Sequence, residues 1–259
     1  MATAVISDIH GNAAALRAVL ADIDAKGVER IICLGDIVGY GPEPRQCVDL
    51  VAERCEWSLL GNHDFGVLYE PTNFNHQAES AAYWTRDRFE NEPDDTSRAR
   101  RYAFLNRLRV RVVFKPEGTH GSILAVHGSP RRPINEYIFP DDVISAGDKM
   151  SSIFDLVDWI AIVGHTHVPG VFTNEPDFYP PDEIGADRTY RFQPDEKAVI
   201  NVGSVGQPRD LDPRASYAVL HKDRVEFHRV DYDIEHTANL IRAEEALHNN
   251  LADRLFDGR

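Results

Sequence analysis

The chain has 259 residues, of which 42% are hydrophobic, and its formal net charge is −14. This length and apolar content fit a single α/β domain, residues 1–259, with a large buried core. The excess of acidic side chains argues against binding to nucleic acid polymers or anionic membranes, because like charges repel. A small anionic substrate remains compatible with this charge if the site holds metal ions, whose own charge enters the local balance.

Five short, mostly apolar runs each lead into a polar cluster, and each run predicts a buried strand. The runs span residues 5–7, 31–34, 57–60, 123–126 and 160–163. The clusters that follow them are Asp8-Ile9-His10, Gly35-Asp36, Gly61-Asn62-His63-Asp64, His127-Gly128 and Gly164-His165-Thr166-His167. Ligands of open α/β sheets bind outside the carboxyl ends of the strands, so we expect the five clusters to form one site.

These clusters supply carboxylates, an amide and imidazoles but no thiolate, a donor set that suits first-row divalent metals such as Mn, Fe or Zn. The candidate ligands are Asp8, His10, Asp36, Asn62, His127, His165 and His167. Seven ligands are too many for one tetrahedral ion, but they suit two ions that share a carboxylate, for which we choose Asp36. Two such ions about 3.5–4 Å apart can clamp a phosphoryl oxygen and activate a bridging water.

The order of these clusters between residues 8 and 167 resembles the signature of the calcineurin-like metallophosphoesterases, and the compact chain is similar to their small bacterial phosphodiesterases and phosphatases. The resemblance implies a four-layer α/β/β/α sandwich of two mixed sheets. It also implies a dinuclear-metal-dependent phosphohydrolase that cleaves phosphomono- or phosphodiester bonds by attack of a metal-bridging hydroxide. We expect Mn or Fe as the two divalent ions, with Zn, Ni or Co as alternatives.

The same resemblance implies a role for each cluster residue. One ion would be held by Asp8, His10, Asp36 and His167, and the other by Asp36, Asn62, His127 and His165. His63 would be the catalytic residue that protonates the leaving group. The related protein phosphatases carry an aspartate three residues after the bridging one, which orients this histidine, but this chain has Gly39 there. The departure weakens an assignment as a protein phosphatase, and Asp64 or a backbone carbonyl would have to orient His63.

Residues 65–110 lie between the third and fourth clusters and contain none of the candidate ligands. Two helix-like stretches separated by a polar break predict a helical cap insertion beside the metal site, with an ordinary helical hairpin packed on the sheet as the alternative. Asn75 and His76 are the cap residues that we expect to face the cleft, although a lone histidine is more often a surface or core residue.

Two arginines are candidate substrate-binding residues. Arg131 follows the fourth cluster closely enough to reach a substrate phosphate, although it is equally compatible with a solvated loop. Arg209 ends the block Gly203-Ser204-Val205-Gly206-Gln207-Pro208-Arg209, which resembles one found after the final histidine in bacterial members of the family. Its glycines would let the loop approach the metals or a phosphate, and the alternative is a simple turn between strands.

The remaining segments are predicted from local patterns. Asn12 is an expected N-cap of a first helix, and a second helix is expected over about 44–54. Residues 141–154 predict one helix, 173–198 a long loop or ragged hairpin, and 217–230 a hairpin. Leu240, Leu247, Leu251 and Leu255 form the apolar stripe of a C-terminal helix, a stripe that more often covers a sheet face than a partner.

The location and partners follow from composition. Three cysteines are an odd number and predict no disulfide framework. The first candidate ligand, Asp8, leaves no room for a cleavable signal peptide, and no apolar stretch approaches the roughly 18 residues of a membrane span. We therefore expect a cytoplasmic protein that acts on a small phosphorylated substrate, with homo-oligomerisation left open. The alternative function is a non-catalytic scaffold that binds partners on the same fold, and the complete ligand set argues against it.

Overall fold

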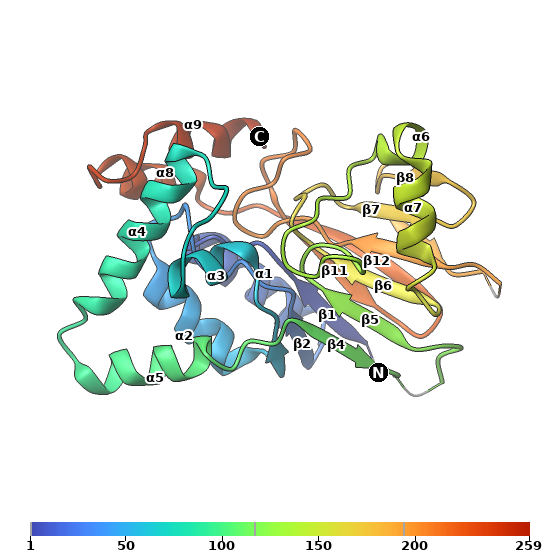
Figure 1. The fold of residues 1–259 in the computed structure, drawn as a ribbon, viewed down its shortest axis with the longest axis horizontal. Coiled ribbons are helices and arrows are strands. Elements are labelled where there is room, and N and C mark those ends of the chain that lie inside the picture. The colour runs from blue at the N-terminus through green and yellow to red at the C-terminus, as the bar shows by residue number, and fades with distance from the viewer. Residues whose placement is uncertain (1, 117, 194) are drawn as a thin grey trace.

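Two six-stranded β-sheets face each other, and helices cover their outer faces (Figure 1). The computed structural model describes residues 2–116, 118–193 and 195–259. The strands of the first sheet are, in spatial order, β3 (Trp57–Ser58), β2 (Arg30–Cys33), β1 (Thr3–Ile6), β11 (Ala215–Leu220), β12 (Arg224–Val230) and β9 (Thr189–Arg191). Those of the second are β4 (Arg111–Phe114), β5 (Ile123–Val126), β6 (Ile160–Val163), β10 (Ala198–Asn201), β7 (Gly170–Thr173) and β8 (Asp177–Tyr179).

Each sheet contains three neighbouring parallel strands, and the remaining neighbours run antiparallel. In the first sheet β1, β2 and β3 are parallel, with Val5 paired to Ile32. In the second sheet β5, β6 and β10 are parallel, with Ile162 paired to Ile200. All five predicted strands are therefore present. Because parallel strands end at the same edge, each sheet delivers its polar clusters to one place.

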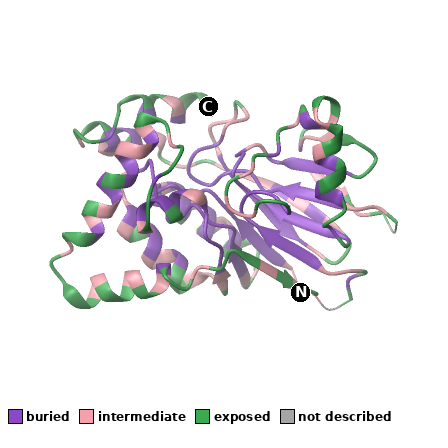
Figure 2. Cartoon of the chain, in the orientation of Figure 1, coloured by how far each residue is buried: buried purple, intermediate pink, exposed green. Residues whose placement is uncertain are grey.

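The apolar runs are continuous because both faces of these strands are buried. On β1, Ala4 and Ile6 pack under the outer helices, whereas Val5 between them points into the core between the two sheets. The same alternation places Ile32 in the inter-sheet core, opposite residues of the second sheet such as Ile162. Figure 2 shows the central strands of the two sheets buried, the edge strand β4 largely exposed, and the helices exposed on their outward sides.

Helices α1 (Ala13–Ala25) and α2 (Pro44–Arg54) cover the outer face of the first sheet, and α7 (Gly147–Phe154) covers that of the second. Helix α1 begins where predicted, because the side chain of Asn12 accepts a hydrogen bond from the Ala15 amide at 3.1 Å. Two mixed sheets between two helical layers confirm the predicted four-layer sandwich. The other helices are α3 (Asn62–Leu68), α4 (His76–Glu90), α5 (Asp95–Leu105), α6 (Asp142–Ser145), α8 (Ile234–Arg242) and α9 (Asn250–Asp257).

Residues 65–110 contain α4 and α5, which stand at one end of the molecule (Figure 1). Helix α5 packs on α2, while Ala81 and Trp84 of α4 pack against α8 and α9. The description of this segment as a cap beside the metal site stays a prediction.

Two predictions about local structure were wrong, and a third was right in only one of its two alternatives. The expected helix over 141–154 is two helices, because Ala146 leaves the helical angles and the following Gly147 is a poor helix former. The segment 173–198 follows its long-loop alternative over most of its described residues, and the hairpin alternative is wrong, since β8 pairs with β7 in one sheet and β9 pairs with β12 in the other. The C-terminal leucine stripe is divided between α8, which holds Leu240, the connection with Leu247, and α9. Leu247, Leu251 and Leu255 pack on α4 instead of a sheet, and Leu240 lies outside this cluster.

No helix in the described residues is long and apolar enough to cross a membrane. Cys33, Cys47 and Cys55 are all free thiols.

Candidate metal centre

The loops that follow β1, β2, β3, β5 and β6 meet at one point and bring all seven candidate ligands together. Backbone hydrogen bonds join these loops within each sheet, and side-chain hydrogen bonds such as those from the His165 amide to Asp8 join them across the sheets. The amides of Ile9 and His10 both donate to the Asp36 carbonyl, at 2.8 and 2.9 Å. The amide of Gly164 donates to the His127 carbonyl at 3.0 Å. The convergence that the strand ends predicted is therefore present, and the role of each residue as a ligand stays a prediction.

The ligand-bearing loops hold several side chains in an unfavourable backbone conformation. Asp8, His10, Asp36, His165 and His167 all have positive φ, between 48° and 63°. Non-glycine residues adopt this left-handed region rarely, at a cost of order 1–3 kcal/mol each, and such strain gathers at functional sites. The surrounding hydrogen bonds therefore maintain a geometry that the chain would not adopt for packing alone.

The donor atoms form two groups that share Asp36. In the first group, Nε2 of His167 lies 3.2 Å from Oδ1 of Asp8 and 3.1 Å from Nε2 of His10, which is itself 3.7 Å from Oδ2 of Asp36. In the second, Nε2 of His127 lies 3.3 Å from Oδ2 of Asp36 and 3.2 Å from Oδ1 of Asn62. One donor atom each from Asp36, His127 and His165 also lies within 4.8 Å of the others.

Three of the histidines are oriented by bonds from their other ring nitrogen. Nδ1 of His10, His127 and His167 lies 3.3, 3.1 and 2.5 Å from the carbonyls of Val38, Leu34 and Gln207 respectively. A histidine that donates Nδ1–H to a carbonyl presents an unprotonated Nε2, which is the arrangement of a metal ligand and its supporting hydrogen bond. The three Nε2 atoms point toward Asp8 and Asp36.

The site is almost closed to solvent, and bound metal ions account for its buried donor atoms better than protons alone do. Asp8 and His127 are 0% exposed, and Nε2 of His165 is buried without a hydrogen-bond partner in the described residues. Donors on one ion at about 2.0–2.1 Å lie roughly 3 Å apart, which is the separation of the His10 and His167 nitrogens. An unpartnered buried nitrogen, two facing imidazoles and two buried carboxylates are all accounted for by bound divalent cations.

The electrostatics of the site favour the protonation states that coordination requires at Asp8, Asp36 and His165, whereas His127 holds a proton until a cation binds. Burial opposes ionisation of Asp8 and Asp36, but His167 and His127 lower the pKa of the two carboxyls below the ordinary range. Burial lowers the pKa of His165 to about 3. Burial also opposes charge on His127, but Asp36 raises its pKa to about 9, so a proton there compensates Asp36 in the metal-free protein. A bound cation would take over that compensation.

His63 lies beside the centre with its ring between two aromatic side chains. Its ring centroid is 4.4 Å from that of Tyr40 and 4.6 Å from that of Phe74, and its amide donates to Oδ1 of Asp36 at 2.8 Å. Burial lowers the pKa of His63 to about 4, so the metal-free protein holds it neutral. Its Nδ1 is buried and has no hydrogen-bond partner within the described chain.

Asp64 does not orient His63, although it was one of the two candidates for that role. Its Oδ1 accepts from the amides of Ile37 and Val38 at 2.9 and 3.2 Å, and its Oδ2 accepts from Gly61 at 3.1 Å. Asp64 therefore braces the loop that carries Asp36 against the start of α3. Packing against Tyr40 and Phe74 is what holds the His63 ring.

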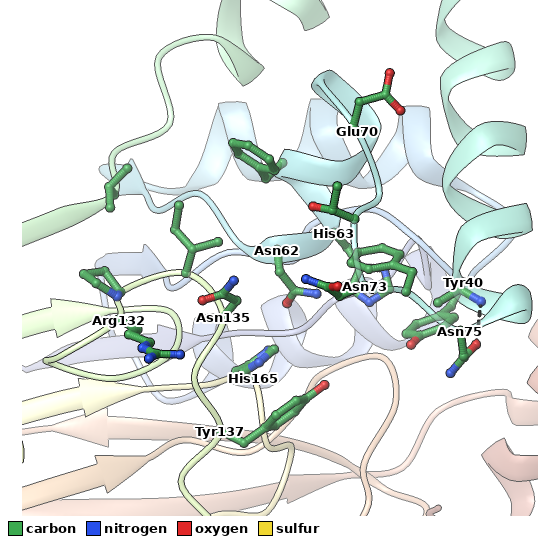
Figure 3. A pocket seen from close by; sticks show the side chains of 17 residues that line it. Tyr40, Asn62, His63, Glu70, Asn73, Asn75, Arg132, Asn135, Tyr137 and His165 are labelled. Carbon is green, nitrogen blue, oxygen red and sulfur yellow. Dashed lines mark hydrogen bonds between the residues drawn. The ribbon is translucent and has the colours of Figure 1, made fainter. Parts of the chain in front are cut away.

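A cavity of about 590 Å³ opens beside the centre, with Asn62, His63 and His165 in its wall (Figure 3). Most of its other residues come from the loop 70–75 before α4 and from the segment 132–137. Tyr137 stacks on His165 with ring centroids 3.8 Å apart and planes 16° apart. The aromatic and amide side chains in the wall are Tyr40, Phe65, Phe74, Tyr137, Asn73, Asn75 and Asn135. The cavity can thus admit an organic group next to the candidate metals.

The two predicted cap residues differ in position. Asn75 does line the cavity, while its side chain caps α4 by accepting from the Ala78 amide at 3.0 Å. His76 is exposed, and its Nδ1 lies 3.2 Å from the Ser80 hydroxyl. Of the pair, only Asn75 faces the cleft as expected.

Arg131 is not among the residues that line the cavity, and its substrate-binding role stays a prediction. Its guanidinium donates to Glu136 at 2.8 and 3.3 Å, and this ion pair holds the loop after β5 together. The next residue, Arg132, lines the cavity instead. No local sequence pattern distinguishes two adjacent arginines. Which of them lines the cavity depends on which one pairs with Glu136 in the folded protein.

Arg209 lies on the loop after β10, which contacts the backbone of the candidate ligands Asp8 and His167. The Ser204 hydroxyl donates to the Asp8 carbonyl at 2.8 Å, and the Arg209 amide donates to the His167 carbonyl at 3.3 Å. A Cβ on Gly206 would meet the Ile9 carbonyl oxygen at 1.8 Å, so glycine is needed for this close approach. The side chain of Arg209 contacts Gln207 at 2.8 Å, and its Nε is buried without a partner in the described structure.

Comparisons with known proteins agree with this geometry. The family described as calcineurin-like phosphoesterase matches residues 1–201. An uncharacterized protein of Methanocaldococcus jannaschii is 39% identical over 261 residues, which cover 99% of this chain and 98% of the relative. The crystal structure of a metallophosphoesterase from Sphaerobacter thermophilus is 37% identical and superposes with a TM-score of 0.79, covering 100% of this chain and 99% of that one.

A more distant structure, a hypothetical protein from Pyrococcus horikoshii, shares the fold at 20% identity with a TM-score of 0.74, covering 100% of this chain and 98% of that one. The family match extends over more than three quarters of the sequence and includes every cluster described above. Sequence and fold together place this chain in the calcineurin-like metallophosphoesterase family.

Proposed function

We propose that this protein is a phosphoester hydrolase that uses two divalent metal ions to cleave a small phosphomonoester or phosphodiester. The observation that supports this most strongly is the position of six buried aspartate and histidine side chains, with Asn62 3.2 Å from His127, directly beside a cavity of about 590 Å³. Family membership supports the same reaction class. Mn or Fe suits the oxygen and nitrogen donor set, with Zn, Ni or Co as alternatives.

In this proposal one ion is held by Asp8, His10, Asp36 and His167, and the other by Asp36, Asn62, His127 and His165. Asp36 would be the bridge, because its Oδ2 lies 3.7 Å from Nε2 of His10 and 3.3 Å from Nε2 of His127, one histidine from each group. When bound, the ions polarise a phosphoryl oxygen and lower the pKa of a coordinated water.

The chain's own groups supply the remaining requirements. His63 stands on the cavity side of the cluster and donates a proton to the leaving oxygen; even a neutral imidazole carries one N–H for this purpose. Arg209 adds a positive charge beside His167 and binds phosphate oxygens. Tyr137 covers His165 and, with Phe74, forms an apolar wall that limits water around the ester.

Metal analysis and ester hydrolysis test this proposal together. Purified protein loaded with Mn²⁺ should contain two ions per chain and hydrolyse p-nitrophenyl phosphate or bis-p-nitrophenyl phosphate. Chelation should abolish the hydrolysis, and added Mn²⁺ should restore it. One ion in fully loaded protein would contradict the two-metal arrangement. Two ions without hydrolysis of either ester would favour a partner-binding scaffold.

A further inference from the structure

His165 differs from the other candidate histidine ligands in how its ring is held. His10, His127 and His167 each have Nδ1 next to a main-chain carbonyl oxygen. In the described part of the chain no residue forms a hydrogen bond with the ring of His165, whose bonds to Asp8 come from the backbone amide. An imidazole without such a bond keeps more freedom about its side-chain torsions, and it loses that freedom when it coordinates a metal.

The ring of His165 is instead covered by Tyr137. The two ring centroids lie 3.8 Å apart and the ring planes differ by 16°, so the faces of the two rings are in van der Waals contact. Figure 3 shows Tyr137 next to His165 in the wall of the cavity. This stack fixes the plane of the imidazole and leaves both ring nitrogens available. A bound metal ion would strengthen the stack, because the imidazole becomes more positive and the face of the phenol ring is negative.

Tyr137 is held in place through its two neighbours in the sequence. Its side chain is 39% exposed, so burial alone does not fix the ring. On one side, Glu136 accepts a hydrogen bond from Arg131 at 2.8 Å. On the other side, Ile138 is 1% exposed and packs in the core cluster under α7. The backbone on both sides of Tyr137 is therefore anchored.

Thr166 connects this wall of the cavity to the loop that carries the ligands. It lies between His165 and His167 in the sequence and is 3% exposed. Its hydroxyl accepts a hydrogen bond from the Ile138 amide at 3.3 Å and donates one to the Ile138 carbonyl at 3.0 Å. One side chain thus binds both main-chain groups of the residue after Tyr137. The contacts form a closed circuit, from His165 along the chain to Thr166, across to Ile138, and through Tyr137 back to the His165 ring.

We propose that Tyr137 is a positioning residue for the metal ligand His165, and that Thr166 sets the tyrosine in place. The stack fixes the plane of the His165 imidazole in the way that carbonyl groups fix the planes of the other three histidines. This inference rests on the proposed metal-dependent function. Groups that orient a metal ligand typically contribute about 10–100-fold to metal affinity, so loss of the stack should be measurable in metal binding alone.

Calorimetric titration of Mn²⁺ into metal-stripped protein tests the stack independently of catalysis. Tyr137→Leu removes the ring but keeps an apolar side chain in the wall, and Tyr137→Phe keeps the ring. Because Tyr137 is exposed, both variants should fold as the wild type does. The matched control is Tyr69→Leu, which removes a tyrosine ring that is 55% exposed and lies outside the cavity wall. Thr166→Val removes the hydroxyl at nearly constant volume, and Thr166→Ser keeps it.

Tyr137→Leu and Thr166→Val should each weaken the binding of one ion about tenfold or more and leave the other ion within about twofold of the wild type. Tyr137→Phe and Tyr69→Leu should bind both ions as the wild type does. Thr166→Ser should recover most of the affinity that Thr166→Val loses.

Wild-type affinity in Tyr137→Leu would overturn the inference. An equal loss in Tyr137→Phe would overturn it as well, because the ring is then not what matters, and so would an equal weakening of both ions. Unchanged affinity in Thr166→Val would contradict the role of Thr166.

Hydrolysis of p-nitrophenyl phosphate, measured on the same samples, separates this inference from the proposed function. A metal affinity that depends on Tyr137, in a protein that hydrolyses no ester, would support the positioning role and contradict only the hydrolase. Hydrolysis by a protein whose metal affinity does not depend on Tyr137 would support the hydrolase and contradict only the positioning role.

Discussion

Gly39 lies directly against the ring of His63. A Cβ built on Gly39 would be 2.5 Å from Nδ1 and 2.9 Å from Cγ of His63, and Gly39 has a φ of 91°. The position where related protein phosphatases carry an aspartate therefore has no room for any side chain in this protein. The chain positions His63 by close packing against a glycine, Tyr40 and Phe74 instead of by a carboxylate.

Substitution of Gly39 should consequently displace His63. Gly39→Ala is expected to lower kcat about tenfold or more, because misplacing a reacting group by about 1 Å can cost 10²-fold. Gly27→Ala is a matched control, since Gly27 has a φ of 67° but nothing within 4 Å of its added Cβ. Both variants should lose about 1–2 kcal/mol of stability from the left-handed angle, and only Gly39→Ala should lose activity. Equal kcat values in the two variants would show that the contact with His63 has no catalytic effect.

The His63→Ala variant should show whether His63 donates a proton to the leaving group or supports the bound metals. The variant is expected to keep its metals and to lose little rate on p-nitrophenyl esters, whose leaving group hardly needs a proton. On alkyl esters the loss should be about 10²-fold or more, the usual scale of general acid catalysis. Steady-state rates on both ester classes, with metal content measured in parallel, provide the check. A uniform loss of rate on both ester classes would mean that His63 contributes to the ground state and not to protonation of the leaving group. Loss of bound metal would mean that His63 supports the metal site.

The Asp36→Asn variant should release its metal more readily than any variant that lacks a single terminal ligand. Oδ2 of Asp36 is close to one histidine from each donor group, and a neutral amide is a poor bridge between two dications. Metal content at one fixed Mn²⁺ concentration should fall further in Asp36→Asn than in His10→Ala or His167→Ala. If all three variants retain equal metal, Asp36 does not bridge the ions.

Arg209→Lys should weaken substrate binding while the fold stays intact. The planar guanidinium of Arg209 can donate two parallel hydrogen bonds to a phosphate, and lysine replaces this with a single point charge. We expect a higher KM for p-nitrophenyl phosphate and an unchanged Tm. An unchanged KM with a lower Tm would instead assign Arg209 to the stability of the loop after β10.

Metal-free protein should become less stable as the pH falls, partly through His63. Burial lowers the pKa of His63 to about 4, below the value near 6.5 expected in the unfolded chain. Between these values the unfolded state binds a proton that the folded state excludes, so this contribution to stability is complete above about pH 6.5 and declines toward pH 4. Urea unfolding at pH 7.5 and 5.5 should show a decline smaller by on the order of 1 kcal/mol in His63→Gln than in the wild type. An identical decline in both proteins would mean that folded His63 takes up a proton at its ordinary pKa.

The predicted strands and the convergence of the ligand clusters could be read from the sequence because both depend on neighbouring residues. A strand buried on both faces is apolar throughout, and the residue that follows it must emerge at the sheet edge, so Asp8, Asp36 and His165 were predictable from their immediate context. The capping role of Asn12 is local in the same way.

Other features depend on contacts between distant parts of the chain and were decided only by the tertiary structure. Glu136 binds Arg131 and leaves Arg132 in the cavity, and Tyr137 covers a histidine 28 positions away. The stripe of α9 packs on α4 and not on a sheet, and the end of this helix bonds to the loop after β10 through Gly258 and Leu211. Periodicity states that a face must be buried, but which surface buries it depends on the relative positions of all the elements, and these arise only when the whole chain packs.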